Sequence, residues 1–258
     1  MNQVHQNFVI SQGTVRREVK YNCDICQDTT WVLDETGTLG RRCECYKKEI
    51  AERLWKKFGI KSADVKKIND YEGYDNITKS LKEKAIGYVS DFDSIISLRE
   101  NGFGIFGQPG SGKSHIVIAI GAALLNRKMK PVEVVYMPYL EVMRELKANV
   151  NDDEYYLKLS RRYQKPKLLI IDDLFKDKVN KGKLIGELKD TDVKHIYPII
   201  NYRYLNNLPM LVSSECTPNM LLDLDEALAG RILESCGNNI TVFKGPSYDY
   251  RIKKFIKK

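Results

Sequence analysis

A glycine-rich segment carries the clearest chemical signal in this sequence. Residues 107–114 read GQPGSGKS and satisfy the pattern G-x-x-x-x-G-K-[ST] at every defined position. Glycines let the backbone turn sharply and direct its N–H groups at phosphate oxygens, and a following helix N-terminus adds partial positive charge. Lys113 would reach the β- and γ-phosphates of ATP, and the Ser114 hydroxyl would ligate Mg²⁺. We therefore predict a nucleotide-binding loop made of Gly107, Gln108, Pro109, Gly110, Ser111, Gly112, Lys113 and Ser114.

A pair of carboxylates follows a short apolar run farther along the chain. Leu168–Ile171 reads LLII and is followed directly by Asp172 and Asp173. The run predicts a buried strand, and open α/β sheets bind their ligands at the carboxyl ends of such strands. Asp172 is predicted to hold Mg²⁺ and Asp173 to act as the base that orients the attacking water. Without the phosphate loop, a strand ending in a solvated acidic turn would be the alternative.

Four cysteines lie close together near the N-terminus. Cys23 and Cys26 form a C-x-x-C pair, and Cys43 and Cys45 form a C-x-C pair after sixteen intervening residues. The sequence has no secretory signal, so a disulfide framework is not expected. Four thiolates suit a closed, tetrahedral, structural zinc site, and Gly37 and Gly40 between the pairs fit a hairpin turn. Incidental thiols are the alternative.

Strand and helix patterns alternate through the part of the chain that holds the phosphate loop, Asp172 and Asp173. Short apolar runs at 103–106, 132–137, 168–171, 210–214 and 240–243 are separated by helical patterns at 113–126, 139–148, 194–206 and 225–235. This alternation predicts an α/β fold with a parallel sheet and helices on both faces. Amphipathic patterns predict two earlier helices, at 45–59 and 80–99. We expect an N-terminal zinc-binding domain over residues 1–70 and an ATPase domain over residues 71–258.

Composition limits the class of protein. The hydrophobic fraction of 43% is enough for a substantial core, and no apolar run approaches the roughly 18 residues that span a membrane. We expect a soluble, cytoplasmic protein with no membrane partner. The net charge is +8, with a balance of +6 over residues 41–67 and of +5 over residues 244–258. These basic segments fit either a nucleic-acid partner or solvated helix faces.

Two mixtures of aromatic and basic residues could bind single-stranded DNA by base stacking and phosphate contacts. The first is Tyr202, Arg203 and Tyr204, and the second comprises Tyr155, Tyr156, Arg161, Arg162 and Tyr163. Core packing is the alternative for the first, and an exposed amphipathic helix is the alternative for the second. In the cysteine region, Trp31, Tyr46, Trp55 and Phe58 could either dock a partner or complete a small core.

The order of motifs over about residues 75–258 resembles the bacterial and phage replicative helicase loaders, which are AAA+ ATPases of the DnaC/DnaI type. The specific part is IINYRY at 199–204, then GRI at 230–232, then SYDYR at 247–251. The resemblance implies an ATPase of slow turnover, regulated by its partner and by single-stranded DNA, that self-associates through its ATPase domain. It also implies a hexameric replicative DNA helicase as partner. The N-terminal cysteine module resembles, more loosely, the zinc-binding region through which such loaders contact the helicase.

The resemblance also assigns roles to two arginines. Arg231 matches an arginine finger acting on ATP held by a neighbouring subunit, and Arg251 matches a second sensor that touches the γ-phosphate in its own subunit. At the first sensor the sequence departs from the family, because Ser213-Ser214-Glu215 replaces a polar run ending in asparagine. Either Ser214 supplies the polar contact or this sensor is weakened. Few residues follow Arg251, so no full C-terminal lid is expected.

Three functions remain open at this point. The leading one is an ATP-dependent loader that delivers a replicative helicase onto single-stranded DNA during replication initiation. An IstB-like ATPase helper of a transposase has a very similar core, although such helpers usually lack a cysteine module. A zinc adaptor whose ATP site is only a switch is the third, and Glu215 is its best support.

Overall fold

The chain folds as two compact units. The computed structural model describes residues 6–9, 16–34, 36–37 and 40–253. The division falls between Arg53 and Leu54, inside helix α1 (Glu44–Phe58) and earlier than the boundary expected after residue 70. The reason is packing: Trp55 Nε1 donates to Asn126 Oδ1 at 3.2 Å, and Phe58 is fully buried beside Gly121. The residues after Arg53 thus belong to the core of the second unit.

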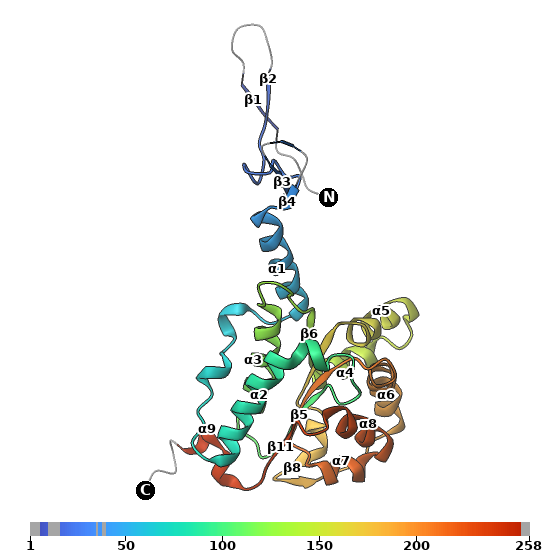
Figure 1. Ribbon diagram of the computed structural model, residues 1–258. Helices are drawn as coiled ribbons and strands as arrows, with labels where there is room; N and C mark the ends of the chain where they lie inside the picture. The colour runs from blue at the N-terminus through green and yellow to red at the C-terminus, as the bar shows by residue number, and fades with distance from the viewer. Residues whose placement is uncertain (1–5, 10–15, 35, 38–39, 254–258) are drawn as a thin grey trace. The chain divides into compact units, whose positions relative to one another are not determined.

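The first unit is built from two antiparallel hairpins and the start of α1 (Figure 1). The first hairpin pairs β1 (Gln6–Val9) with β2 (Arg16–Val19), where the sequence predicts only a loose arm; residues 1–5 and 10–15 of that arm lie outside the described residues. The second pairs β3 (Trp31–Leu33) with β4 (Gly40–Arg42). Gly37 has φ +70° between these strands, so the hairpin predicted between the cysteine pairs is confirmed.

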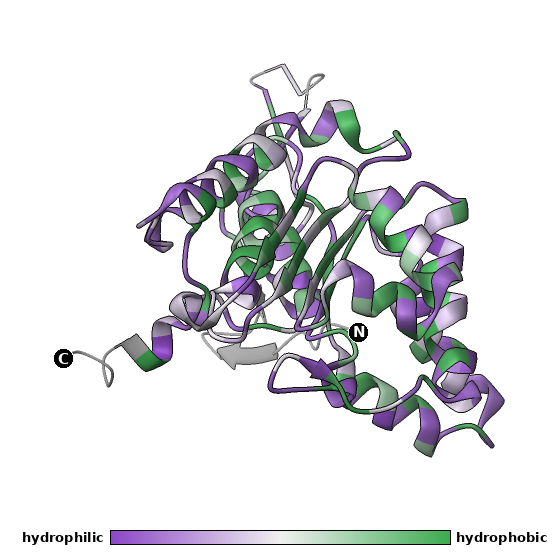
Figure 2. Ribbon diagram, turned by 90° about the horizontal axis from the view of Figure 1, so that it is seen from below, coloured by the Kyte–Doolittle hydropathy of each residue, from purple (hydrophilic) through white to green (hydrophobic). Residues whose placement is uncertain are grey.

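A five-stranded sheet forms the centre of the second unit. Its strands are β5 (Phe103–Gly107), β6 (Val134–Pro138), β7 (Leu168–Asp172), β10 (Met210–Ser214) and β11 (Ile240–Phe243), in the order β11-β5-β10-β7-β6, and every pair is parallel. Strands β5, β7 and β10 are buried along their whole length, and Figure 2 shows the sheet as predominantly hydrophobic. The predicted parallel sheet is confirmed, with β10 inserted between the loop strand and the carboxylate strand.

Helices cover both faces of this sheet (Figure 1). On one face lie α2 (Asn76–Ile95) and α3 (Lys113–Leu125); on the other lie α4 (Tyr139–Ala148), α5 (Asp153–Gln164), α6 (Asp190–Leu205) and α8 (Glu226–Cys236). Apolar strands need cover on both sides, which explains why their sequences show continuous apolar runs. In the described parts of the chain, no helix is long and apolar enough to cross a membrane.

Shorter elements complete the second unit. Helix α7 (Pro218–Leu224), the hairpin of β8 (Val179–Asn180) with β9 (Lys183–Leu184), and the terminal helix α9 (Tyr250–Lys253) were not expected from the sequence. The 3₁₀ turns among the described residues are η1 (Ser62–Asp64), η2 (Ile68–Asp70), η3 (Lys176–Lys178) and η4 (Pro246–Tyr248). Helix α2 begins before the predicted residue 80 because the Asp75 carboxylate accepts from the Thr78 N–H at 2.7 Å and caps it.

Candidate functional site

The predicted phosphate loop joins β5 to α3 in the required conformation. Gly107, Gly110 and Gly112 have φ of +96°, +75° and +85°. This left-handed region is open to glycine and costly for other residues. Space is also short, because a Cβ on Gly112 would come within 2.6 Å of the Tyr71 ring and one on Gly107 would collide with the Phe243 carbonyl. The loop therefore needs its glycines for both backbone conformation and packing.

Lys113 begins α3 and turns its ammonium back into the loop. Its Nζ donates to the Gly107 and Gln108 carbonyls, both at 2.9 Å, and only 5% of the residue is exposed. Burial lowers the pKa of Lys113 to about 8, and the neighbouring charge of Asp173 opposes that shift. Because carbonyls are weak partners for a buried cation, the ammonium is prepared to exchange them for phosphate oxygens.

The two predicted carboxylates stand at the end of β7 in different surroundings. Asp172 is buried and accepts hydrogen bonds from the Tyr136 hydroxyl at 2.8 Å and from the Ser213 hydroxyl. Asp173 has φ +55°, and its N–H donates to Ser213 Oγ at 3.0 Å. Burial raises the pKa of Asp173, and the charge of Asp172 raises it further. Asp172 is thus fixed as an acceptor, while Asp173 has the environment of a base.

A cleft of about 540 Å³ brings most of the predicted nucleotide-site residues together. That volume lies in the ordinary range for small-molecule sites. Its walls include Pro109 to Ser114 from the loop, together with Asp173 and Arg251. Sequence reasoning missed further lining residues, namely Tyr71, Tyr74, Lys176 and Tyr250. Tyr71 and Tyr74 carried one detectable signal, because they are aromatic residues in the polar stretch between the helices predicted at 45–59 and 80–99.

Two of these missed residues tie distant segments to the loop. The Tyr71 hydroxyl donates to the Ser111 carbonyl at 3.0 Å, and the Tyr250 N–H donates to the Gly110 carbonyl at 3.0 Å. Arg251 follows directly; its side chain is 73% exposed, with Nε at 3.9 Å from Asp249 Oδ1. The C-terminal motif SYDYR is thereby held at the phosphate end of the cleft.

At the first-sensor position, the two expected candidates behave differently. Ser214 is fully buried, and its hydroxyl donates to the Leu174 carbonyl at 2.6 Å and accepts from the Cys216 N–H at 3.0 Å. Glu215 lines the cleft instead and forms an ion pair with Lys176. The structure therefore commits the Ser214 hydroxyl to the backbone and places a paired carboxylate where the sequence departs from the family pattern.

Arg231 lies on α8, away from the lining of its own cleft as far as the described residues define it. Its Nε donates to Asn201 Oδ1 at 2.9 Å, and its two terminal nitrogens donate to the Ala227 carbonyl at 2.7 Å and the Tyr197 hydroxyl at 3.0 Å. The guanidinium is thus held against α6. This position is compatible with action on a nucleotide bound by another subunit.

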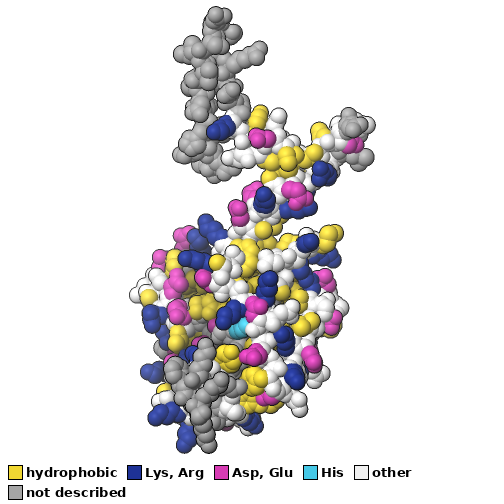
Figure 3. Space-filling model, turned by 90° about the vertical axis from the view of Figure 1, so that its left-hand side faces the viewer, with side chains coloured by type: hydrophobic (Ala, Val, Ile, Leu, Met, Phe, Trp, Pro, Cys, Tyr) yellow, Lys and Arg dark blue, Asp and Glu magenta, His cyan; other side chains and the backbone are white. Residues whose placement is uncertain are grey.

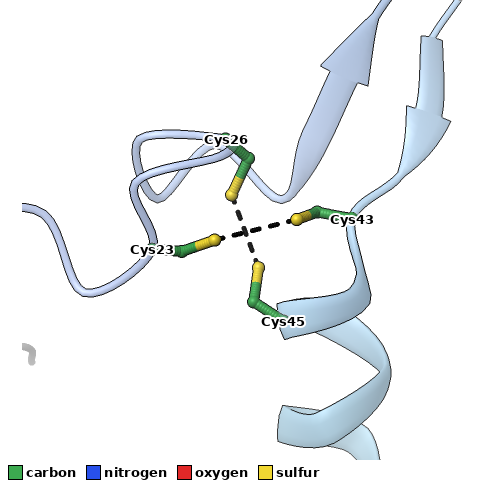
Figure 4. A group of neighbouring side chains, drawn as sticks. All are labelled: Cys23, Cys26, Cys43 and Cys45. Carbon is green, nitrogen blue, oxygen red and sulfur yellow. Dashed lines mark hydrogen bonds between the residues drawn. The ribbon is translucent and has the colours of Figure 1, made fainter.

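The four clustered cysteines converge from two segments of the first unit (Figure 4). Their sulfurs all lie within 4.8 Å of one another, with Cys23 to Cys43 at 3.7 Å and Cys26 to Cys45 at 3.4 Å. A tetrahedron with Zn–S bonds of about 2.3 Å has S–S edges of about 3.8 Å, whereas a disulfide needs about 2.0 Å. The tetrad therefore fits a zinc ion, and the thiols are free of disulfides.

The turn around the first pair prepares it for a metal. The Gln27 N–H donates to the Cys23 carbonyl at 2.8 Å, and the Asp28 carboxylate accepts from the Cys23 N–H at 3.0 Å. The N–H of Cys26 lowers the pKa of the Cys23 thiol to about 7, whereas the hydrogen bond with the Cys26 side chain raises the pKa of Cys45. Zinc would replace these sulfur–sulfur hydrogen bonds and hold all four groups as thiolates.

The aromatic residues of the cysteine region separate between the two units. The Arg42 guanidinium lies 4.0 Å from the Trp31 ring centroid and 4.3 Å from that of Tyr46, so these two rings enclose a cation within the first unit. Trp55 and Phe58 belong to the second unit and pack there. Trp31 stays 45% exposed, and Ile25 and Leu33 are also exposed. The first unit therefore retains an apolar surface.

The prediction that Arg203 contacts single-stranded DNA is wrong. Arg203 is completely buried, and its guanidinium donates to the carbonyls of Tyr163, Gln164, Pro166 and Pro209. A phosphate cannot reach it, because the guanidinium is buried between the segment before β7 and the residue before β10. Tyr163 is buried too, whereas Arg161 and Arg162 are exposed on α5. On the face seen in Figure 3, basic side chains are interspersed with acidic ones.

The profile of the IstB-like ATP binding protein family matches residues 44–215, which is more than half of the chain. The chain belongs to this IstB-like family. The matched range contains the phosphate loop, both aspartates and Glu215. The second unit is accordingly an ATP-binding domain.

Relatives of this IstB-like chain occur in Bacillus subtilis (strain 168). It is 38% identical over 213 residues to the uncharacterized protein YqaM, covering 81% of this chain and 64% of YqaM. It is 32% identical over 241 residues to the phage-like element PBSX protein XkdC, covering 89% of this chain and 85% of XkdC. The chain thus spans less than two thirds of YqaM and most of XkdC.

Solved structures share the fold of the IstB-like chain. A crystal structure of the DnaC helicase loader matches with a TM-score of 0.55 at 20% identity, covering 75% of this chain and 99% of that one. A crystal structure of DnaI matches with a TM-score of 0.54 at 20% identity, covering 70% and 89%. The replication initiator DnaA bound to AMPPCP and single-stranded DNA matches at 0.53 and 17%, covering 74% and 56%. The fold is that of an AAA+ P-loop NTPase.

Proposed function

We propose that this protein is an ATP-dependent loader that delivers a hexameric replicative DNA helicase onto single-stranded DNA during replication initiation in the cytoplasm. The observation that carries the proposal is the combination of a cleft lined by the phosphate loop and Asp173 with a separate unit whose four cysteines converge on one point. The fold shared with DnaC and DnaI supports it.

In the proposed hydrolysis, the predicted motif residues divide the tasks. The loop N–H groups and Lys113 hold the phosphates, while the Ser114 hydroxyl and the Asp172 carboxylate would hold Mg²⁺, which supplies neutralising charge to the phosphate oxygens. Asp173 orients the attacking water and accepts its proton, a role that suits its raised pKa. Gln108 and Pro109 shape the loop, and the Ser214 hydroxyl, which donates to the Leu174 carbonyl, holds the turn that follows β7.

Two arginines would supply positive charge to the developing transition state from opposite sides. Arg251 acts in its own subunit from the rim of the cleft, where its exposed side chain has room to swing onto a phosphate. Arg231 acts on the nucleotide of a neighbouring subunit, so turnover requires self-association through the ATPase domain. We expect slow turnover that rises with partner or single-stranded DNA, because the cleft of an isolated subunit lacks the Arg231 of a neighbouring subunit.

The first unit is the proposed docking module for the helicase. Its cysteines would hold zinc as a structural ion, and the exposed side chains of Ile25, Trp31 and Leu33 offer an apolar surface for a protein partner. The runner-up, an ATPase helper of a transposase, is supported by membership of the IstB-like family. A zinc adaptor with a switch-only ATP site is supported by Glu215 in the cleft.

A capture experiment with the full chain discriminates these functions. The tagged chain, saturated with ATP, is incubated with purified replicative helicase or with purified transposase, and multiple-turnover ATP hydrolysis is measured with and without single-stranded DNA. A loader retains the helicase and hydrolyses ATP; Lys113→Ala abolishes hydrolysis while the fold is kept. Retention of the transposase alone, or helicase binding without any turnover, would replace the loader by the helper or the adaptor respectively.

A further inference from the structure

An ion pair lies inside the nucleotide cleft, at the edge of the sheet where phosphates would bind. Glu215 follows β10 and Lys176 follows β7, and these neighbouring strands are parallel, so their carboxyl ends meet. The two side chains pair directly with each other, and both line the same cleft as Lys113. None of the sequence motifs includes Lys176, and the proposed hydrolysis gives the pair no task.

The two members of this pair differ in their exposure to water. The Glu215 side chain is 9% exposed, and that of Lys176 is 36% exposed. A carboxylate so far removed from water needs a cation or a set of donors close by. Lys176 meets that need for Glu215, while its own position leaves the ammonium accessible from the open part of the cleft.

The backbone around Lys176 is fixed, so movement would be confined to the side chain. The Leu174 N–H donates to the Ser213 carbonyl at 2.9 Å, and the Lys176 N–H donates to the Asp173 carbonyl at 3.1 Å. Phe175 between them is buried. A lysine carries its charge on a flexible four-carbon stem, so the ammonium can change partners without any rearrangement of the turn.

The charges nearby place Lys176 at the phosphate end of the cleft. Burial lowers the pKa of Lys113 most, the charge of Asp173 raises it, and the positive charge of Lys176 lowers it. Burial and Asp172 raise the pKa of Asp173, and the charges of both lysines and of Arg251 lower it. Lys176 therefore shares one electrostatic region with the residues assigned to the terminal phosphates.

We propose that Lys176 is a second phosphate-binding lysine, held by Glu215 until the terminal phosphate of a nucleoside triphosphate takes its ammonium. The inference rests on the proposed nucleotide binding at this cleft. Glu215 then acts as a competitor: it lowers triphosphate affinity, because release of Lys176 leaves a poorly hydrated carboxylate behind. Lys176 distinguishes triphosphate from diphosphate, since the diphosphate lacks the terminal phosphate that competes with Glu215 for the ammonium.

Three variants of the full chain test this assignment by equilibrium binding of ADP and of a slowly hydrolysed ATP analogue. Lys176→Met should weaken triphosphate binding about tenfold and ADP binding less than about twofold, as for loss of one charge-assisted contact. Glu215→Gln should strengthen triphosphate binding about threefold, and the gain should vanish in the double variant because it acts through Lys176. Lys57→Met, from the exposed Lys57–Glu133 pair, is the matched control and should change neither affinity.

Several outcomes would overturn the assignment. Equal losses of triphosphate and ADP affinity in Lys176→Met, or no loss, would make the pair merely structural. A gain from Glu215→Gln that persists in the double variant would show that Glu215 repels phosphate without involving Lys176. Thermal melting of each variant separates these effects from unfolding. The assay contains no helicase, so its failure is distinguishable from failure of the loader function, and a wild-type chain that binds neither nucleotide would refute the site itself.

Discussion

Replacing Arg203 by methionine tests the finding that this arginine supports the fold and does not bind DNA. Its guanidinium donates to four backbone carbonyls at 2.8–3.2 Å, three in the segment before β7 and one before β10. Burial lowers the pKa of Arg203 to about 9, and the four carbonyls compensate for that unfavourable burial of charge. Methionine fills similar volume without donating, so the carbonyls lose their partners.

The magnitude follows from those four bonds. Each buried acceptor left without a donor costs about 1–3 kcal/mol, but removing the buried charge and retaining apolar contacts offset part of the sum. We expect Arg203→Met to lower the free energy of unfolding by about 3–5 kcal/mol. For a domain of this size, about 2–4 °C per kcal/mol predicts a Tm decrease of roughly 6–20 °C.

Thermal and urea unfolding of the full chain provide the assay, with Arg161→Met on the exposed face of α5 as the control. The control should stay within about 0.5 kcal/mol of wild type. Single-stranded DNA binding, measured well below the Tm, should be unaffected in Arg203→Met. A free-energy change under about 1 kcal/mol combined with lost DNA binding would refute the structural role and restore the phosphate-contact hypothesis.

Three further predictions address the sites. Arg231→Ala should bind ATP normally but hydrolyse it at least about tenfold more slowly, and mixing it with Lys113→Ala should restore part of the turnover; full activity of the single variant would exclude an action in trans. Cys43→Ser should reduce the zinc content from about one ion per chain and loosen the first unit while ATP still binds; metal-free wild type with four titratable thiols would exclude the zinc site. ATP affinity should fall about tenfold between about pH 7 and pH 9. In the nucleotide-free protein Lys113 loses its proton above its pKa of about 8, whereas bound phosphate favours the protonated ammonium. An ATP affinity that does not change with pH in titration calorimetry would contradict this.

The sequence alone was sufficient where chemistry is encoded by adjacent residues. The phosphate loop satisfies a spacing typical of a strand, a tight turn and a helix, so the sequence by itself predicts the place of Gly107 to Ser114 between β5 and α3. The alternation of apolar runs with helical patterns was likewise enough for a parallel sheet, because strands covered on both faces must be apolar throughout. The cysteine spacings predicted a convergence that the sulfur positions now show.

Local patterns gave less where a residue's role depends on its distant partners. The position of Arg203 between two tyrosines fits both DNA binding and core packing. Only the four carbonyls that converge on it identify a buried structural arginine. Trp55 and Phe58 looked like part of the cysteine region, yet they pack against α3 and its C-terminal end, which moves the division between the units into α1. Charge and aromaticity are visible in a sequence, but burial is not.

The nucleotide cleft shows most clearly which features the sequence determined and which only the tertiary structure decided. The sequence by itself determined which residues could hold phosphate and where the two aspartates stand, because a β-strand delivers the residue after it to the edge of the sheet. Only the tertiary structure decided that Tyr71 and Tyr250 reach the loop and that Glu215 is paired with Lys176. The physical reason is strand order: β7 and β10 are separated by a long stretch of chain, and their pairing in the sheet is what brings a lysine and a glutamate together.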